Sequence, residues 1–442
     1  MTRPEDGAGP EPRQGLAVAL AGLALTVWTL YHLVLLWGTW PPDLAAIYIA
    51  GYLWDTGAPA LIYAAPAHFF GGAPPDWAPV IARLGGPDGG AFPFIYPPAW
   101  AAIMAPLTRV ISAQGFFNAA FAVQLPLVAL CIPLARRIAG SRMHPLKWAL
   151  LGIVLLESAT PFYSAINQAQ PTILVCLLIL IALERSLAGA PRMAGSALAL
   201  AAAIKITPVI FAILFITRRD WRALGCCALT GAAFLAADVA ICGLAPNLWF
   251  LAALKGAAST TLISPVNVSA RALTDFWLAL AAQVHIWPAP NLYIFELPAW
   301  LRHLSTLANL GLWLILGGRI LLAAQGLDAR PRMMVSALAL STGLFLFGPL
   351  GWQHYYLLPL VLLPGLATIA PPWAAAVAAF PALVGENIFL FTGLLSADPP
   401  PSYYVCLAVG GWIGTLLLTD RLVRRAVANP APSARNDSSA RF

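Results

Sequence analysis

Residues 16–43 read LAVALAGLALTVWTLYHLVLLWGTWPPD, an apolar run that ends in two prolines and an acid. The first 22 residues of this stretch are enough for a helix that crosses the roughly 30 Å hydrocarbon core of a bilayer. Pro41 and Pro42 end that helix at the far surface. Asp43 then lies where an embedded site meets water, so it is a candidate general base. The alternative is an acid at a helix end with no chemical role.

The composition is that of a membrane protein. Hydrophobic residues make up 60% of the chain and charged residues 10%, and the mean hydropathy is +0.78. Soluble domains carry about 25% charged residues, so we expect an all-α, polytopic membrane protein. The net charge of +7 does not indicate a nucleic-acid partner, because the basic residues lie in short loops between apolar runs. The cysteines lie in or beside apolar runs without paired spacing, which is typical of small core residues and gives no redox or metal signal: Cys131, Cys176, Cys226, Cys227, Cys242 and Cys406.

The apolar runs predict a bundle of about 12 spans with both termini in the cytoplasm. The spans lie at 16–37, 115–135, 148–165, 171–184, 193–204, 207–217, 223–243, 303–323, 333–350, 355–370, 373–394 and 403–420. This assignment gives one transmembrane domain over residues 16–425. The flanking segments, 1–15 and 426–442, are expected to be cytoplasmic tails, the second of them disordered.

The basic residues support this topology. Only Arg83, Arg109, Lys255, Arg271 and Arg302 fall on the outer side, with Lys205 near a span end. The other 19 of the 25 lie on the cytoplasmic side, as the positive-inside rule requires: Arg3, Arg13, Arg136, Arg137, Arg142, Lys147, Arg185, Arg192, Arg218, Arg219, Arg222, Arg319, Arg330, Arg332, Arg421, Arg424, Arg425, Arg435 and Arg441.

The positive-inside rule also predicts the arrangement of two segments, 97–111 and 193–217. Residues 97–111 cannot cross, because a crossing would place the basic cluster that follows on the outside, so we expect juxtamembrane helices in the first extracytoplasmic loop. Residues 193–217 have arginines at both ends that belong on one side. We therefore expect two short helices with a tip at Lys205, where the proline at 208 disfavours a continuous helix.

Several polar residues face the outer side in this topology. Lys205 lies at membrane depth, where a lysine costs about 2.5–3.5 kcal/mol, so it is either a ligand of an anionic group or a snorkelling side chain. Arg271 is a second phosphate candidate or an ordinary interfacial arginine. His354 would contact a phosphate or belong to an aromatic belt, and Gln170 would bind sugar hydroxyls or cap a helix. No metal triad, nucleotide loop or hydrolase motif is present in the sequence.

The order of motifs resembles glycosyltransferase family 87, the polyprenyl-phosphate-mannose-dependent mannosyltransferases of the GT-C superfold. The matching pieces run from Asp43 and Tyr48 through Gly57 and Tyr63, Phe94-Ile-Tyr96-Pro97-Pro98, Ala169-Gln170, and Arg192 to Lys205-Ile-Thr-Pro208. They continue with Asn267-Val-Ser269 and Gly351-Trp352-Gln-His354. One departure is that the family's Gly-Gln-Val-Asn reads Ala169-Gln170-Pro171-Thr172 here, which puts sugar contacts at that loop in question.

The resemblance implies a bundle of the GT-C type and an inverting hexosyltransferase. The donor would be a mannose-like sugar on a polyprenyl phosphate, and the acceptor a hydroxyl of a glycolipid or glycan at the outer face of the plasma (inner) membrane. Asp43 would be the catalytic base, while Lys205, His354 and Arg271 would hold the donor phosphate. Tyr48, Tyr96, Gln170, Asn267 and Trp352 would line the substrate cavity, and no metal or other cofactor is implied.

Two other classes remain open. Asp238, Glu157 and Glu386 lie within or beside spans, and acids so placed are typical of transporters, which makes a transporter or flippase of lipid-linked sugars the alternative. Such proteins usually contain internal repeats, and none is visible here. A polymerase or ligase of surface polysaccharide would use similar donors, but its large outer loop is usually rich in arginine, whereas the outer loops here are not.

Overall fold

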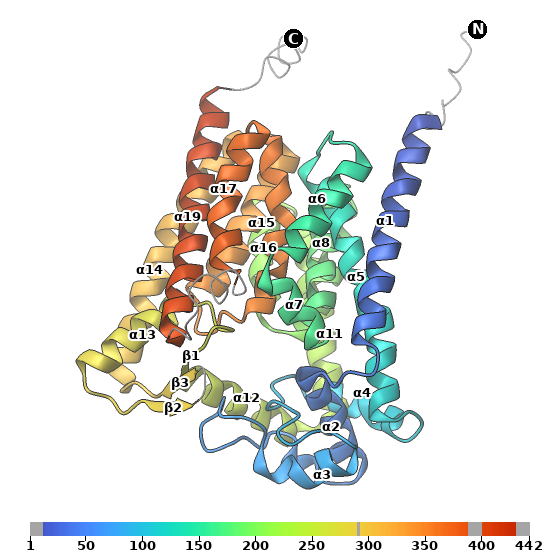
Figure 1. Cartoon of the computed structure of the whole chain (residues 1–442), viewed down its shortest axis with the longest axis vertical. Coiled ribbons are helices and arrows are strands. Elements are labelled where there is room, and N and C mark those ends of the chain that lie inside the picture. Colours follow the sequence, from blue (N-terminus) through green and yellow to red (C-terminus); the bar gives the residue numbers. More distant parts are fainter. Residues whose placement is uncertain (1–11, 290–291, 388–399, 430–442) are drawn as a thin grey trace.

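The computed structural model describes residues 12–289, 292–387 and 400–429 as a bundle of helices with a layer of short elements at one end (Figure 1). Helix α1 (Pro12–Leu36) begins, and α19 (Pro401–Ala428) ends, at the opposite end of the bundle. We call these the loop end and the terminal end. α1 begins inside the expected tail 1–15 and α19 extends past residue 425, whereas the expected disorder of the second tail concerns mostly residues outside the described ranges.

A helix, or a run of short helices, lies at each predicted span. Within the described residues, five helices are long and apolar enough to cross a membrane, or six if α6 and α7 form one bent span, so the chain is a multi-pass membrane protein. The other bundle helices are α5 (Ala113–Ala139), α6 (Pro145–Glu157), α7 (Thr160–Asn167), α8 (Thr172–Leu187), α9 (Pro191–Ile204), α10 (Ala212–Thr217), α11 (Trp221–Cys242), α14 (Ala299–Ala323), α15 (Ala329–Leu346), α16 (Leu357–Leu362) and α17 (Pro372–Gly385).

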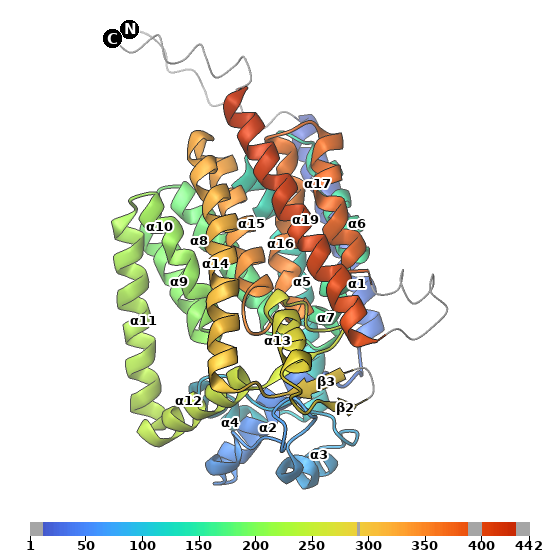
Figure 2. The same ribbon diagram turned by 90° about the vertical axis from the view of Figure 1, so that its left-hand side faces the viewer.

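The loop end contains α2 (Pro42–Asp55), α3 (Ala78–Arg83), α4 (Ala99–Thr108) and α12 (Leu244–Ser259), with the 3-10 turns η1 (Pro59–Leu61) and η2 (Pro75–Trp77) between α2 and α3. A further 3-10 turn, η4 (Ala324–Gly326), follows α14. Figure 2 shows α2, α4 and α12 side by side beneath the bundle. Gly51 allows α2 to approach Met104 of α4, because a Cβ there would lie 2.5 Å from the Met104 Cγ. Residues 97–111 thus stay within this layer, and α5 starts from it.

The chain breaks at Lys205, as expected. Lys205 is extended (φ −139°, ψ 133°) and is followed by η3 (Thr207–Phe211), which leads into α10. The start of α9 and the end of α10 lie on the same side of the bundle. A hydrogen bond between their flanking segments supports this, because the Ser186 hydroxyl at the end of α8 donates to the Asp220 carboxylate before α11 at 2.9 Å. The two halves therefore form a short hairpin with Lys205 at its tip.

The predicted span 148–165 corresponds to two helices, α6 and α7, with a sharp bend between them. α6 and α7 meet at 79°. Ala159 is extended, and the freed backbone groups find partners across the bundle: the Thr160 amide donates to the Glu386 carbonyl at 3.2 Å, and the Asn387 amide group donates to the Ser158 carbonyl at 3.1 Å. These bonds compensate the interruption, which membrane helices tolerate only when a neighbour satisfies the backbone.

The region 353–368 is also less regular than the predicted span 355–370. It consists of η5 (Gln353–Tyr356), α16 and η6 (Leu363–Thr368). For the predicted span 373–394, α17 ends at Gly385, and residues 388–399 lie outside the described part of the chain.

A small sheet departs from the all-helical prediction. Strands β1 (Thr261–Ile263), β2 (Trp287–Ala289) and β3 (Leu292–Phe295) form an antiparallel sheet in the order β1-β3-β2, next to α13 (Ala270–Ala281). Thr261 faces Phe295 in the register. β-Branched and aromatic residues favour strands, but three- and four-residue strands carry no period that a sequence pattern could reveal.

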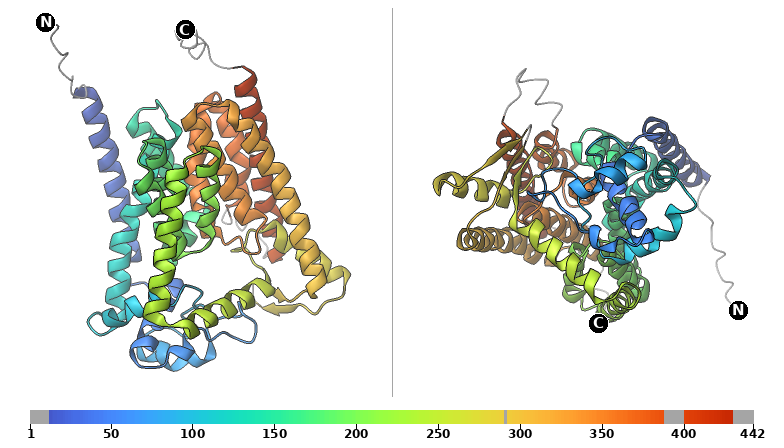
Figure 3. Two further views of the ribbon diagram at one scale, coloured as in Figure 1. Left: turned by 180° about the vertical axis from the view of Figure 1, so that it is seen from behind. Right: turned by 90° about the horizontal axis from the view of Figure 1, so that it is seen from below.

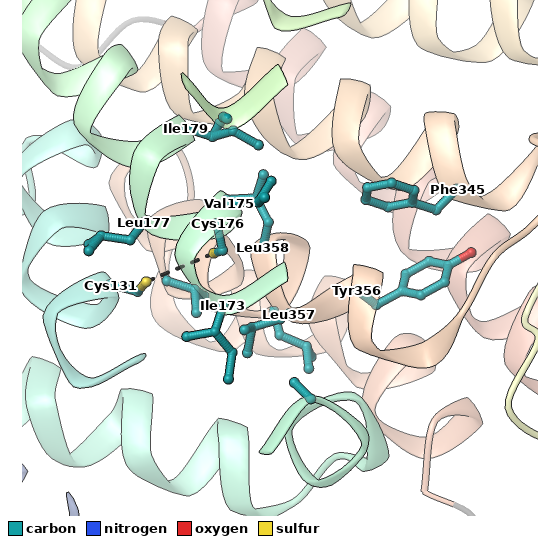
Figure 4. Packing of buried hydrophobic residues seen from close by; sticks show 14 of the residues in the cluster. Cys131, Ile173, Val175, Cys176, Leu177, Ile179, Phe345, Tyr356, Leu357 and Leu358 are labelled. Atoms are coloured by element: carbon teal, nitrogen blue, oxygen red, sulfur yellow. Dashed lines mark hydrogen bonds between the residues drawn. The ribbon is translucent and has the colours of Figure 1, made fainter. Parts of the chain in front are cut away.

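The interior is filled by apolar side chains of α5, α8, α15 and α16, as Figure 4 shows around Cys131 and Cys176. Their sulfur atoms lie 3.9 Å apart and form no disulfide. The prediction of core cysteines holds for Cys131, Cys176, Cys227 and Cys242, which are buried, but Cys406 is exposed on the surface of α19. Figure 3 shows this bundle from behind and from below.

Arginines join the helices at the terminal end. Arg137 of α5 pairs with Glu184 of α8 at 2.9 Å, and Arg319 of α14 pairs with Asp420 of α19 at 3.0 Å. These residues come from segments that the sequence analysis assigned to one side of the membrane.

This arrangement makes a prediction about sidedness. In a variant without the six native cysteines, a cysteine at Asp76 in the loop end should react with a membrane-impermeant maleimide added to intact cells. A cysteine at Arg142 should react only after permeabilisation, because the positive-inside rule places the terminal end in the cytoplasm. Both positions are exposed, so accessibility within the protein is matched. Labelling of the Arg142 position alone in intact cells would reverse the topology.

Candidate active site

A cavity of about 240 Å³ lies where the loop end meets the bundle. Six of the predicted site residues line it, together with Gln168: Asp43, Tyr96, Gln170, Lys205, Trp352 and His354. They come from α2, from the segment before α4, from the α7–α8 turn, from the tip after α9 and from the start of η5. Five separate stretches of sequence therefore meet at one place.

A chain of hydrogen bonds connects the acid to the lysine. The Gln170 side-chain nitrogen donates to the Asp43 carboxylate, and its oxygen accepts from the Lys205 ammonium at 3.1 Å. The Lys205 ammonium also donates to the Thr172 hydroxyl at 2.8 Å. Asp43 and Lys205 form no direct ion pair, so Gln170 separates the two charges while it contacts both. In this orientation each end of the amide meets the charge that it favours.

The turn that presents Gln170 has a strained residue. Ala169 adopts φ +44°, in the left-handed region that usually requires glycine, and it ends α7. Its carbonyl accepts a hydrogen bond from the Gln124 side chain at 3.0 Å. Pro171 then starts α8, because its ring is compatible only with the first turn of a helix. The turn holds Gln170 between two helix ends, with 3% of its surface exposed.

Lys205 is surrounded by aromatic rings and neutral acceptors. Its ammonium lies 4.6 Å from the Tyr355 ring centre and 5.8 Å from that of Tyr96. A cation over such rings is attracted by their quadrupole. No carboxylate among the described residues pairs with it directly. Its charge is therefore available to an anionic group in the cavity.

His354 has an open nitrogen beside this lysine. Its side chain is 5% exposed, and Nε2 has no hydrogen-bond partner among the described residues. Its ring meets Tyr355 edge-on at 4.7 Å. Buried polar atoms are rarely left without a partner, so this nitrogen is suited to contact a ligand.

Burial changes the acid–base properties of Asp43. Removal of its carboxylate from water raises the pKa of Asp43 to about 6, although the Gln170 hydrogen bond and the Lys205 charge lower it. A carboxyl group in this range is ionised near neutral pH and still accepts a proton readily.

Three predicted site residues do not line the cavity. Arg271 lies on α13 and faces Asp275 at 3.8 Å. Tyr48 donates to the Ile111 carbonyl at 2.7 Å and so fastens α2 to the start of α5. Asn267 donates to the Leu262 carbonyl at 2.7 Å and accepts from the Gly351 amide at 2.8 Å.

The sequence analysis missed several lining residues. Tyr355 lines the cavity and contacts Lys205, and it directly follows the Gly351–His354 motif. Thr172 is not part of the lining but accepts from Lys205, and it stood inside a motif that the sequence analysis had noted. Other lining residues gave no pattern, because most of them come from the loop end or from the small sheet and the residues beside it: Phe69, Phe70, Phe92, Leu262, Ser264 and Leu292, with Ser164 on α7.

The other acids that were considered lie elsewhere. Asp238 accepts from the Ala99 amide at 2.9 Å and so caps α4. Glu157 accepts from His32 at 2.6 Å, and Glu386 accepts from Trp412 at 2.6 Å. Asp43 is the one carboxylate among the described residues that line the cavity. The described residues contain no group of three or more His, Cys, Asp or Glu side chains that could hold a metal ion.

A model of glycosyltransferase family 87 matches residues 94–349, more than half of the chain. The helical bundle and this match define a membrane glycosyltransferase. The chain belongs to glycosyltransferase family 87. No curated protein and no solved structure gives a significant match. The matched region contains Gln170 and Lys205, whereas Asp43 and His354 come from the segments on either side of it.

Thr172 provides a test of the Lys205 environment. In Thr172→Val the shape is kept but the ammonium loses its nearest acceptor, which should destabilise the fold by about 1–3 kcal/mol. The change should appear as a lower thermal unfolding temperature of the purified protein in detergent. Thr172→Ser keeps the hydroxyl and is the matched control. Equal unfolding temperatures for all three proteins would show that this bond does not hold Lys205.

Proposed function

We propose that this glycosyltransferase moves a mannose-like hexose from a polyprenyl-phosphate donor to a hydroxyl of a glycolipid or glycan, with inversion at the anomeric carbon. The observation that carries the proposal is the pairing of one carboxylate and one ammonium across Gln170 inside a single cavity. A transfer of this kind needs a base for the acceptor and a cation for the leaving phosphate, and the cavity offers both.

Asp43 is the base in this proposal. The acceptor oxygen attacks the anomeric carbon, its proton passes to the Asp43 carboxylate, and the bond to the phosphate oxygen breaks with the electron pair leaving on the phosphate. A retaining double displacement would need a second carboxyl group close to the first. Among the described lining residues Asp43 has no such partner, which favours inversion.

Lys205 and His354 would hold the departing phosphate. The ammonium has neutral partners only, and the open His354 nitrogen lies in the same cavity. Fixed donors aimed at growing negative charge stabilise a transition state without reorganisation. Arg271 is left out of this set because it faces Asp275. Tyr96 and Trp352 remain proposed contacts of the sugars.

The topology belongs to the same proposal. We infer about 12 spans of the GT-C type in the plasma membrane, with both termini cytoplasmic and the cavity on the extracytoplasmic side. The basic residues at the terminal end and the polar cavity near the loop end support this orientation. Donors linked to lipid would then reach the site within the outer leaflet, and no nucleotide would be needed there.

Substitution of the two charged groups separates an enzyme from a flippase of lipid-linked sugars. Asp43→Asn keeps the shape but cannot accept a proton, so sugar transfer should fall by about 10²–10⁴ while donor binding stays near that of the wild type. Lys205→Ala should weaken donor binding and turnover together, because a phosphate ligand acts in the ground state and the transition state alike. The measurement is transfer by purified protein from a panel of radiolabelled polyprenyl-phosphate sugars. Near-normal transfer by Asp43→Asn would remove Asp43 from the chemistry.

The pH dependence gives an independent check of the base. Asp43 accepts a proton only when ionised, and its pKa is raised to about 6. The apparent second-order rate constant should therefore rise as pH increases through about 6. The residual activity of Asp43→Asn should lack this step. A wild-type profile that is flat from acid to neutral pH would contradict the assignment.

A further inference from the structure

Residues 64–74, which we call the cap loop, contribute Phe69 and Phe70 to the wall of the cavity. Both ends of the cap loop are anchored. The Tyr63 hydroxyl donates to the Tyr96 carbonyl at 2.8 Å, and the buried Trp77 donates to the Leu61 carbonyl at 2.8 Å. These anchors fix where the cap loop starts and ends.

Between the anchors the backbone of the cap loop has few bonds. Among the described residues, the Gly71 amide donates to the His68 carbonyl at 2.7 Å, within the loop itself, and no main-chain bond joins residues 65–73 to a neighbouring element. Gly72 has φ +130°, a conformation that glycine adopts readily. A segment with few backbone bonds opens more easily than the elements around it.

Two aromatic contacts join the cap loop to other parts of the chain. The His68 ring lies 4.1 Å from the Trp287 ring, centre to centre, and the Phe70 ring meets Trp352 edge-on at 5.4 Å. Trp287 belongs to β2, and Trp352 precedes η5 and lines the cavity, so both contacts join the cap loop to segments far away in the sequence. Such contacts are weak individually and are broken without loss of any backbone bond.

The closed cavity is small for its proposed task. Its volume of about 240 Å³ is below the ~300–1,000 Å³ typical of ligand pockets. Phe69 and Phe70 of the cap loop form part of its lining, so movement of the loop enlarges it.

We propose that the cap loop is a gate over the cavity, and that His68 and Trp287 determine how large an acceptor the site admits. Release of the His68–Trp287 and Phe70–Trp352 contacts lets the loop swing on its glycines and uncovers the mouth. The acceptor part of this inference rests on the proposed function, whereas the gate itself does not.

The test measures access to the cavity without measuring catalysis. Ser164 lines the cavity on α7 and serves as a reporter when changed to cysteine in a protein without the native cysteines. Its labelling is timed with a small methanethiosulfonate and with a maleimide that carries polyethylene glycol. His68→Ala and Trp287→Ala should each raise the rate at which the bulky reagent labels the reporter cysteine by about tenfold, with little effect on the rate for the small reagent.

The control is Trp277→Ala. Trp277 lies on α13, is 61% exposed and does not line the cavity, so its loss should leave both labelling rates unchanged. His68→Ala leaves the sheet intact and keeps the test valid if Trp287→Ala fails to fold. Unchanged labelling by the bulky reagent in His68→Ala, or equal acceleration of both reagents, would overturn the gate.

A locked gate completes the experiment. Cysteines at positions 68 and 287, joined by a reducible bifunctional reagent, should lower sugar transfer at least tenfold, and reduction should restore it. Full activity in the joined state would overturn the inference. If labelling responds as expected but no polyprenyl-phosphate sugar is transferred by any form, the gate stands and the proposed function fails.

Discussion

The contact of Gln170 with both Asp43 and Lys205 is the constraint around which the centre of the molecule is built. A carboxylate and an ammonium placed together in a poorly solvated site would neutralise one another, and neither would then serve a substrate. The amide keeps them apart and satisfies both, because it offers a donor to one and an acceptor to the other. Three helix ends position the residues of this contact. The end of α7 and the start of α8 hold Gln170, and the end of α9 holds Lys205. Each brings a polar backbone or side chain to a depth where the remaining bundle is apolar.

The parts of this arrangement that could be predicted from sequence depend on local physical rules. Apolar length located the helices, prolines located the break at Lys205, and the asymmetry of arginines located the loop that does not cross. The bend between α6 and α7 could not be predicted, because the carbonyl that satisfies it belongs to Glu386, more than two hundred residues away in the sequence. The same holds for the wall formed by β1 and β3, whose strands are too short to show a period.

The site residues show the same division. Asp43, Lys205 and His354 were found from unusual positions for charged or polar groups in an apolar chain. Thr172 was considered only as a departure from the family pattern, although its hydroxyl provides the acceptor that Lys205 needs. Tyr48 and Asn267 were chosen from the family resemblance and Arg271 for its guanidinium, but the hydrogen bonds and the ion pair of these residues are made within the protein. Residue type and order along the chain therefore indicate which groups are near the site, and only the three-dimensional contacts distinguish those that face it.

The backbone bond between Thr160 and Glu386 has a consequence for the order in which the protein is made. Chains emerge from the ribosome with the N-terminal part first. Asp43, Gln170 and Lys205 are all synthesised long before Glu386, so the bend that places α7 is completed only when α17 has been inserted. A nascent chain in which the helices before α17 have already been inserted would still lack a formed cavity. A chain that lacks α17 therefore lacks the carbonyl that accepts the hydrogen bond at this bend.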